Sequence, residues 1–313
     1  MAASSLLLIK IQKIKQNKIN YINGSEIRFV KWLFIIIGLT NVLSQIYSYK
    51  LVGIPLLSES RLGIYSQDGG INNLLKRIIS FSFQCYILLT IFFIYYKKNF
   101  FWKVYTYFSI IILVAFSILS GSKGAFIIFG FAFFIYSLFS MRWGDFSLFN
   151  SIKKFAIKFG LFAVLLALIV ILFSEKTSNP LGFLLTRIAQ TGDVYYMAYP
   201  NEIIDKIPSS NWFISLFASP LSILGVIPRS SVPYPMGYSL MEYHNPFTHF
   251  KGPNARINVF SYVYFGIIYS PIYCFFIGLL VSFFRNRLFH ILPSSLLGCI
   301  VYFLFLTSAL KLE

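Results

Sequence analysis

Three side chains that can move a proton stand close together in the sequence, at Glu242, His244 and His249. A histidine titrates near neutral pH, so either imidazole can accept a proton from an attacking hydroxyl group. Glu242 can orient a histidine or act as the base itself. The stretch lacks the His-Glu-x-x-His motif and the His-x3-Glu spacing that hold zinc on a helix, so we expect no metal here. The alternative is a surface histidine that hydrogen-bonds to backbone.

A second set of residues suits an anion, namely Arg61, Lys123, Arg187, Arg229 and Arg256. Arginine offers fork-shaped hydrogen bonds to phosphate oxygens, and lysine offers a point charge. A pyrophosphate group suits such a cluster if separate loops bring these side chains together. Taken singly, each residue is equally an anchor at a membrane surface.

Lys123 lies in the stretch Ser-Gly-Ser-Lys-Gly-Ala at 120–125. Its glycines and serines permit a tight turn with free backbone N–H groups, which favour anions at the start of a helix. The spacing is not that of a P-loop, and a plain turn is the alternative.

The composition places these residues in a membrane protein. Of the 313 residues, 57% are hydrophobic and 12% are charged, and the mean hydropathy is +0.72. Soluble domains carry about 25% charged residues, so this chain cannot cover a globular surface with polar groups. Cys85, Cys274 and Cys299 lie in apolar runs without metal or redox spacing, and we expect no cofactor.

The predicted fold is an all-α, polytopic bundle of about seven spans with one long external loop that contains short helices. A span needs about 20 apolar residues. The stretches that qualify are 29–48, 78–96, 102–120, 124–141, 155–173, 258–284 and 290–310. Five spans thus fall within 29–173 and two within 258–310. The sixth carries Pro271, which predicts a kink or tilt.

The net charge of +17 would suggest nucleic acid in a soluble protein, but here its distribution predicts orientation. With the N-terminus inside, 15 of the 27 basic residues and two of the ten acidic residues are cytoplasmic. Trp32, Trp102 and Trp143 then share the cytoplasmic boundary. We expect a basic cytoplasmic segment at 1–28 and no nucleic-acid partner. Residues 311–313 resemble the junction to a purification tag and are set aside.

The long external loop spans 174–257 and holds nine of the twelve prolines. A loop of this length is usually functional. We expect an ordered lid, with a helix at 181–199 along the membrane interface. An apolar stretch at 214–226 is too short to span alone, so it is expected to re-enter the membrane or to line a groove.

Four segments resemble the oligosaccharide repeat-unit polymerases of bacterial surface polysaccharides (O-antigen polymerase, Wzy type). The stretch 53–58, with Arg61 just after it, resembles their first external loop, and 120–125 resembles their Gly-Ser-Arg-Gly-Ala turn. The stretch 184–192 resembles the start of their long periplasmic loop, and 252–254 with the following aromatic span resembles its end. The resemblance covers about 50–285. The chain has Lys123 where the family usually has arginine, and fewer spans than is common there.

The resemblance implies a glycosyltransferase in the bacterial inner membrane. It would join undecaprenyl-pyrophosphate-linked repeat units into O-antigen or capsular polysaccharide at the periplasmic face. Its partners would be lipid-linked glycans, membrane lipid and a chain-length regulator protein. An O-antigen ligase, which belongs to a related superfamily, is one alternative. A non-enzymatic transporter or flippase is another, although the predicted spans hold no charge away from their ends and no matching pair of broken helices.

Overall fold

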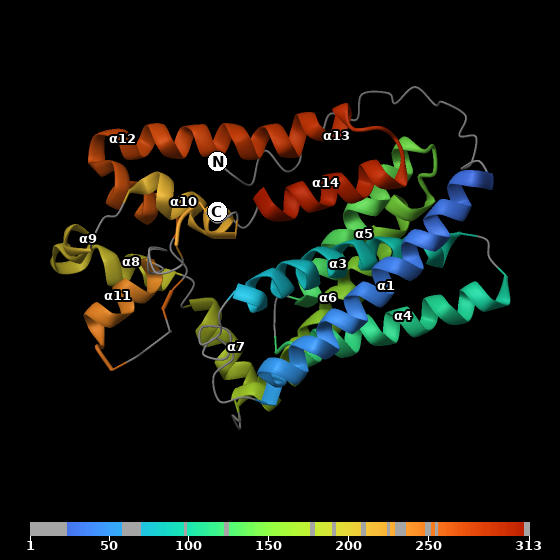
Figure 1. Ribbon diagram of the computed structural model, residues 1–313, viewed down its shortest axis with the longest axis horizontal. Coiled ribbons are helices and arrows are strands. Elements are labelled where there is room, and N and C mark those ends of the chain that lie inside the picture. Colours follow the sequence, from blue (N-terminus) through green and yellow to red (C-terminus); the bar gives the residue numbers. More distant parts are fainter. Residues whose placement is uncertain are drawn as a thin grey trace.

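The computed structural model describes residues 24–57, 70–96, 99–121, 125–175, 179–189, 192–207, 211–223, 226–228, 236–247, 252–253 and 256–309. Within these ranges every regular element is helical and no strand occurs, which confirms the all-α prediction. Long helices pack side by side, and shorter helices gather toward one end of them (Figure 1).

The first five predicted spans correspond to five long helices. They are α1 (Gly24–Val52), α3 (Gly70–Tyr95), α4 (Phe100–Leu119), α5 (Ala125–Arg142) and α6 (Ser147–Glu175). Five runs of the described chain are long and apolar enough to cross a membrane: Glu26–Leu57, Leu74–Tyr95, Phe100–Leu119, Ala125–Arg142 and Ile257–Ile291. The helices therefore support a membrane-spanning protein.

Buried hydroxyl groups inside these helices bond to the backbone of their own helix. The hydroxyl groups of Thr90, Thr106, Ser109 and Ser117 each donate to the backbone carbonyl four residues earlier, at 2.6–2.8 Å. Burial of a hydroxyl bonded in this way costs little free energy in an apolar medium, because its donor is satisfied. This explains how helices that are apolar overall contain so many buried serines and threonines.

Aromatic rings form the centre of the bundle. Phe34 of α1 stacks on Phe93 of α3, with ring centroids 4.6 Å apart, and meets Tyr105 of α4 edge-on at 4.9 Å. Trp102 of α4 stacks on Phe93 at 5.3 Å, and Lys31 of α1 lies 5.4 Å from the Trp102 ring centroid. The start of α1, the end of α3 and the start of α4 therefore lie at the same end of the bundle.

Arg142, the last residue of α5, binds the C-terminal part of the chain at this end of the bundle. Its guanidinium donates to the carbonyl oxygens of Phe289 and Leu292, the latter at 2.9 Å. It also lies over the rings of Phe139 and Phe289, at 5.2 and 5.1 Å. These carbonyl groups lie toward the C-terminal end of α13 (Leu288–Ile291), where the helix dipole favours a cation.

The kink predicted for the span at 258–284 is present, but it is much sharper than expected and lies at another residue. Ser261 and Ser270 both lie in α12 (Ile257–Ser282), yet their hydroxyl oxygens are only 2.6 Å apart. A straight helix would separate them by about 13 Å. The chain reverses at Gly266, which has φ 66° and ψ −178°, a conformation that is essentially restricted to glycine. The bend is thus at Gly266 and not at Pro271, which stays inside the helix.

The last predicted span, 290–310, is also shorter than expected. After a π-helical turn, η5 (Phe283–Arg287), and α13, the chain turns at Pro293 before α14 (Leu296–Ala309) begins. Pro293 cannot continue a helix from the preceding residues. The 14 residues of α14 rise about 21 Å, less than the roughly 30 Å of hydrocarbon in a bilayer.

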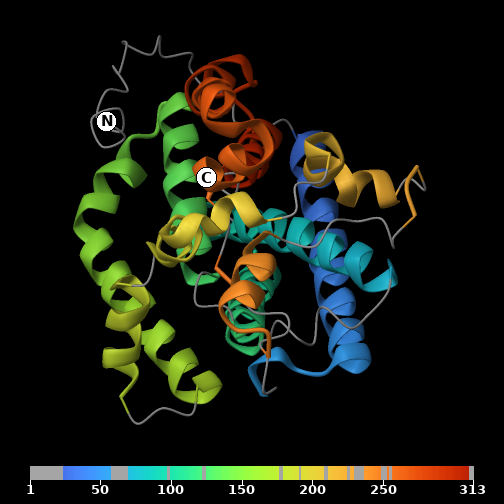
Figure 2. The same cartoon turned by 90° about the vertical axis from the view of Figure 1, so that its left-hand side faces the viewer.

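The region predicted as a long external loop is built from short helices. They are α7 (Pro180–Ala189), α8 (Asp193–Ala198), η3 (Pro200–Glu202), α9 (Ile203–Lys206), α10 (Trp212–Ile223) and α11 (Met236–His244). The single helix predicted at 181–199 is therefore wrong, because α7 ends at Ala189 and α8 begins after Gly192. Viewed from the left-hand side of Figure 1, the short helices lie in front of the long ones (Figure 2).

Candidate functional site

Three short helices and the first part of α12 pack into a core of their own. Its buried side chains are Val194, Ala198, Ile203, Ile204, Ile207, Met236, Leu240 and Val259, from α8, α9 and its C-terminal edge, α11 and α12. Segments far apart in the sequence thus form one unit, which we call the end cap (192–207, 236–247, 252–253 and 256–265). This unit holds the described catalytic candidates.

Two glycines allow the end cap to close. A Cβ atom on Gly237, in the first turn of α11, would collide with the backbone carbonyl oxygen of Pro253. A Cβ atom on Gly252 would collide with the carbonyl oxygen of Gly237. Backbone therefore meets backbone here, and only glycine leaves the space. The contact fixes the start of α11 against the residues that lead into α12.

His244 ends α11 and has a defined orientation. Its Nε2 atom lies 2.9 Å from the backbone oxygen of Met197 in α8. A carbonyl oxygen can only accept, so Nε2 carries the proton and, in the neutral ring, Nδ1 holds the lone pair. The side chain is exposed. The backbone-bonded histidine foreseen as the alternative is therefore present, and the same bond leaves Nδ1 able to accept a proton.

Helix geometry argues against Glu242 as the group that orients His244. Both residues lie on α11, two positions apart, and a helix turns about 100° per residue. Their side chains thus leave the helix on nearly opposite sides, where residues two apart do not meet. The carbonyl of Met197 takes the orienting role instead. Glu242 is partly buried and stays a separate candidate.

Two tyrosine rings lie on α8, the helix whose carbonyl group binds His244. Tyr195 and Tyr199 are one turn apart on α8, with ring centroids 6.1 Å apart and planes only 9° from parallel. The Tyr195 hydroxyl donates to the side-chain oxygen of Asn258 at 3.2 Å, which links α8 to α12. Aromatic faces of this kind suit the apolar faces of sugar rings.

The pKa of Tyr199 is raised. Partial burial raises it above the usual value for tyrosine, and the neighbouring Tyr195, Tyr262 and Cys274 add to the shift. A tyrosine with an ordinary pKa is already neutral at neutral pH, so the Tyr199 hydroxyl is a hydrogen-bond donor there. The broken helix contributes to the raised pKa, since Cys274 follows the reversal at Gly266 and Tyr262 precedes it.

The predicted anion-binding residues are only partly described. Arg256 precedes α12 and is partly buried in the end cap. Arg187 lies on α7, which packs on α6, but its side chain is outside the described part. Arg61, Lys123, Arg229 and His249 lie outside the described residues. Whether the five basic residues gather around one group therefore stays a prediction.

The segments next to Arg61 and Lys123 do meet. Leu56, in the turn η1 (Pro55–Leu57) that follows α1, joins a buried cluster with Phe126 of α5 and Val170 of α6. Ile118, near the end of α4, packs on the same cluster. Two of the stretches that carry the family resemblance, 53–58 and 120–125, thus have neighbouring anchors at the opposite end of the bundle from Arg142.

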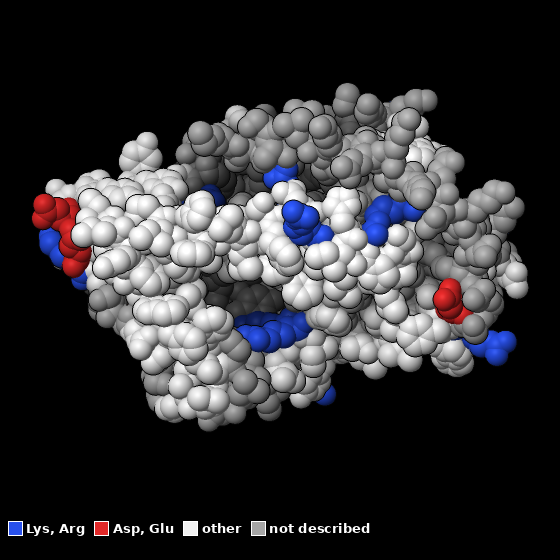
Figure 3. All heavy atoms as spheres, turned by 90° about the horizontal axis from the view of Figure 1, so that it is seen from above, with Lys and Arg blue, Asp and Glu red and all other residues white. Residues whose placement is uncertain are grey.

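Charged residues are sparse on the described surface. Seen from above, acidic and basic atoms lie together at the end where α9 projects, and basic atoms also lie at a hollow near the middle of this face (Figure 3). The exposed residues of η3 and α9 include Glu202, Asp205 and Lys206. No three His, Cys, Asp or Glu side chains gather to hold a metal ion within the described part of the chain.

Sequence reasoning did not single out Met197, Asn258 or the pair Tyr195 and Tyr199. The four-residue spacing of the two tyrosines was the available signal, because it places both on one face of a helix. Nothing in the sequence pairs Met197 with His244, which is 47 residues away.

Comparisons with protein-family models, with curated proteins and with solved structures gave no match.

Proposed function

We propose that this chain is a membrane glycosyltransferase that polymerises undecaprenyl-pyrophosphate-linked repeat units at the periplasmic face of the bacterial inner membrane. The product would be O-antigen or capsular polysaccharide. The observation that carries the proposal is the hydrogen bond from His244 Nε2 to Met197, which leaves Nδ1 able to accept a proton and joins His244 to the helix that carries Tyr195 and Tyr199. The resemblance of four segments to repeat-unit polymerases supplies the reaction.

In the proposed reaction, a hydroxyl oxygen of the incoming repeat unit attacks the anomeric carbon of the growing glycan. A new C–O glycosidic bond forms, and the bond from that carbon to undecaprenyl pyrophosphate breaks. The leaving pyrophosphate keeps the electron pair of the broken bond. His244 Nδ1 takes the hydroxyl proton, with Glu242 or His249 as the alternative bases.

The basic residues would stabilise the departing anion. Negative charge grows on the pyrophosphate as its bond to carbon breaks, and fixed cations that face this charge lower the barrier. The leading candidates are Arg187, Arg61 and Lys123. Arg229 and Arg256 are further candidates. The tyrosine faces would hold sugar rings of either substrate.

The N-terminus is proposed to be cytoplasmic and the end cap periplasmic. The packing supports helices that cross the membrane in alternating directions. The start of α1, the end of α3, the start of α4 and the end of α5 all lie at one end of the bundle. The excess of basic residues predicted for that end argues for the cytoplasm.

One observation favours a second candidate, a transporter. The reversal at Gly266 makes α12 a broken helix, and broken helices often bind substrates in transporters. The two candidates make different products. A polymerase lengthens glycans, whereas a flippase moves lipid-linked units across the bilayer without changing their length.

The test uses the purified protein in liposomes with a synthetic undecaprenyl-pyrophosphate-linked repeat unit. Mass spectrometry of the lipid-linked products should show glycans of two, three and more repeats. Deletion of the gene in its host should reduce long surface chains to single repeats. Single repeats in vitro together with unchanged surface chains would refute the polymerase. Transfer of one unit to lipid A would indicate a ligase.

A further inference from the structure

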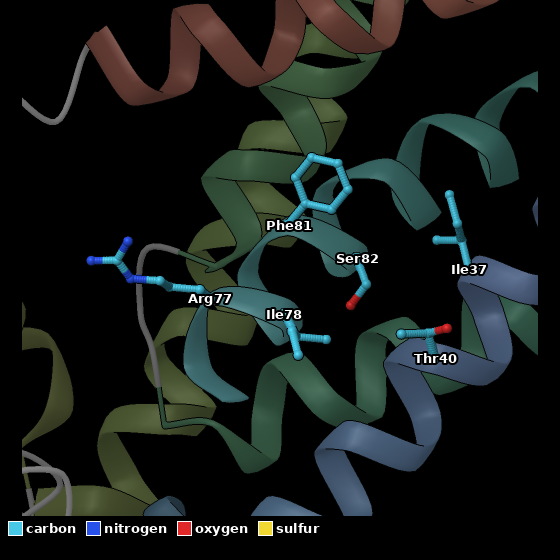
Figure 4. A pocket seen from close by; sticks show the side chains of 6 residues that line it. All are labelled: Ile37, Thr40, Arg77, Ile78, Phe81 and Ser82. Carbon is cyan, nitrogen blue, oxygen red and sulfur yellow. The ribbon is translucent and has the colours of Figure 1, made fainter. Parts of the chain in front are cut away.

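A groove lies between α1 and α3, outside the end cap. It has a volume of about 320 Å³ and is lined by Ile37, Thr40, Arg77, Ile78, Phe81 and Ser82. This volume is at the lower end of the range for small-ligand sites, which is about 300–1,000 Å³. Figure 4 shows Arg77 at one end of the row of lining side chains and Ile37 at the other.

The groove opens to the space that lipid would fill. Ile78 is 38% exposed and Phe81 is 57% exposed, although both lie on a helix long and apolar enough to span a membrane. On the other wall, Ile36 and Leu43 of α1 flank the groove residues and are exposed as well. An apolar hollow in such a surface adjoins acyl chains and not water.

Its depth can be followed along the two helices. The side-chain amide of Asn41 donates to Ser82 at 3.0 Å and to the carbonyl of Ile79 at 3.4 Å, which sets these residues at one level. Gly38 lies against the ring of Tyr86, one turn deeper. Ile37 is therefore about 12–14 Å further into the bundle than Arg77. One leaflet of a bilayer has about 15 Å of hydrocarbon, so the groove ends where an acyl chain ends.

Arg77 supplies charge at the mouth of the groove. It stands directly before Ile78, the first residue of the predicted span 78–96, at the end of the apolar part of α3. A long side chain at this depth keeps its stem among apolar groups and its guanidinium at the headgroup level. Figure 4 shows the guanidinium extending away from the other lining side chains. Guanidinium binds phosphate with two hydrogen bonds.

We propose that this groove holds one acyl chain of an anionic phospholipid from the surrounding membrane, with the headgroup phosphate on Arg77. The length of the groove selects this occupant, because a polyprenyl tail would extend far beyond a 12–14 Å hollow. The site is independent of the proposed reaction, since it needs only the packing of α1 on α3. It gives the joint between these helices a lipid-dependent stability.

The test compares lipid retention by four forms of the full chain: wild type, Arg77→Gln, Arg77→Lys and Lys76→Gln. Each is reconstituted with equal amounts of phosphatidylglycerol and phosphatidylcholine of identical chains, extracted into detergent and examined by native mass spectrometry. Lys76 is the matched control, because it has the same charge at the same level of α3 but does not line the groove. Circular dichroism confirms that each variant is folded.

Wild type should retain one phosphatidylglycerol at about fivefold preference over phosphatidylcholine, the size expected for one basic residue near an anionic headgroup. Arg77→Gln should abolish the preference, Arg77→Lys should keep most of it, and Lys76→Gln should leave it unchanged. Ile78→Trp, which fills the groove, should lower retention of both lipids.

Three results would overturn the proposal. The first is equal loss of preference in Arg77→Gln and Lys76→Gln, which would mean general surface charge. The second is displacement of the lipid by inorganic phosphate alone, which would mean that the apolar groove is not used. The third is stronger binding of undecaprenyl phosphate than of phosphatidylglycerol, which would assign the groove to a lipid carrier.

Discussion

At the scale of single residues, hydrogen bonds to backbone carbonyls define what two side chains can do. Met197 accepts from His244 and so selects the imidazole tautomer with a lone pair on Nδ1. Phe289 and Leu292 accept from Arg142, which thereby joins the end of α5 to α13. His244 is the base in our proposal, and Arg142 holds two parts of the bundle together.

We expect His244→Ala to lower polymerisation by about 10²–10⁴-fold, the usual contribution of a general base. The measurement is the rate of glycan lengthening in liposomes. His290→Ala is the control, because His290 is also exposed but lies beside Phe289 near Arg142. Full activity of His244→Ala would move the base to Glu242 or His249.

Arg142→Gln should lower the free energy of unfolding by about 2–4 kcal/mol, because charged hydrogen bonds to two carbonyl groups are lost. The measurement is denaturant unfolding in detergent followed by circular dichroism. Lys103→Gln removes an exposed charge near the start of α4 and should change the free energy by less than about 0.5 kcal/mol. Equal effects of the two substitutions would contradict a specific role for Arg142.

At the scale of elements, the hairpin within α12 determines the end cap. The part before Gly266 packs in the end cap through Val259, while the part after it exposes Ile267, Ile268 and Phe275. A straight helix could not hold Ser261 against Ser270 and Cys274, because its two halves would extend along one line. The glycine thus lets one apolar run serve as both an anchor and a lipid-facing helix.

A cysteine at position 261 tests the hairpin. The Ser261 oxygen lies 3.2 Å from the Cys274 sulfur, so Ser261→Cys should form a disulfide with Cys274 under mild oxidation. In a straight helix the two residues would be about 20 Å apart and could not react. The measurement is the mass of the chain after thiol alkylation, with Cys85 and Cys299 replaced by alanine.

Adding Gly266→Ala to that variant should reduce the yield of disulfide, because alanine disfavours the backbone conformation of the reversal. Gly130→Ala is the control, since a Cβ there meets no other atom within 4 Å. Absence of the disulfide in the chain with Gly266 intact would favour the continuous span.

At the scale of the whole molecule, the two ends of the bundle differ in construction. Aromatic stacks and Arg142 close one end, and the end cap with its exposed tyrosines lies toward the other (Figure 1). Asp145 belongs to the first end and Asn201 to the end cap, and both are exposed. These two positions therefore report the orientation of the chain in the membrane.

We expect a cysteine at position 201 to react with a membrane-impermeant maleimide in cells whose inner membrane is intact. A cysteine at position 145 should react only after that membrane is opened. The chain used for labelling lacks its three native cysteines. Labelling of both positions from one side would contradict the bundle arrangement, and a reversed pattern would invert the proposed orientation.

The sequence by itself determined the helical class and the location of the first five long helices. Apolar runs of about 20 residues must satisfy their backbone hydrogen bonds internally, and a helix does this without any distant partner. The break between the third and fourth predicted spans was also readable, since α4 ends at Leu119 and α5 begins at Ala125.

Only the tertiary structure decided where α12 reverses, what orients His244 and how the end cap closes. Gly266 looks like any glycine in an apolar run, and its left-handed φ follows from packing on both sides of it. The bond between His244 and Met197 and the backbone contact of Gly237 with Gly252 join residues far apart in the sequence. Such contacts leave no periodic signal, because they depend on where whole helices come to rest.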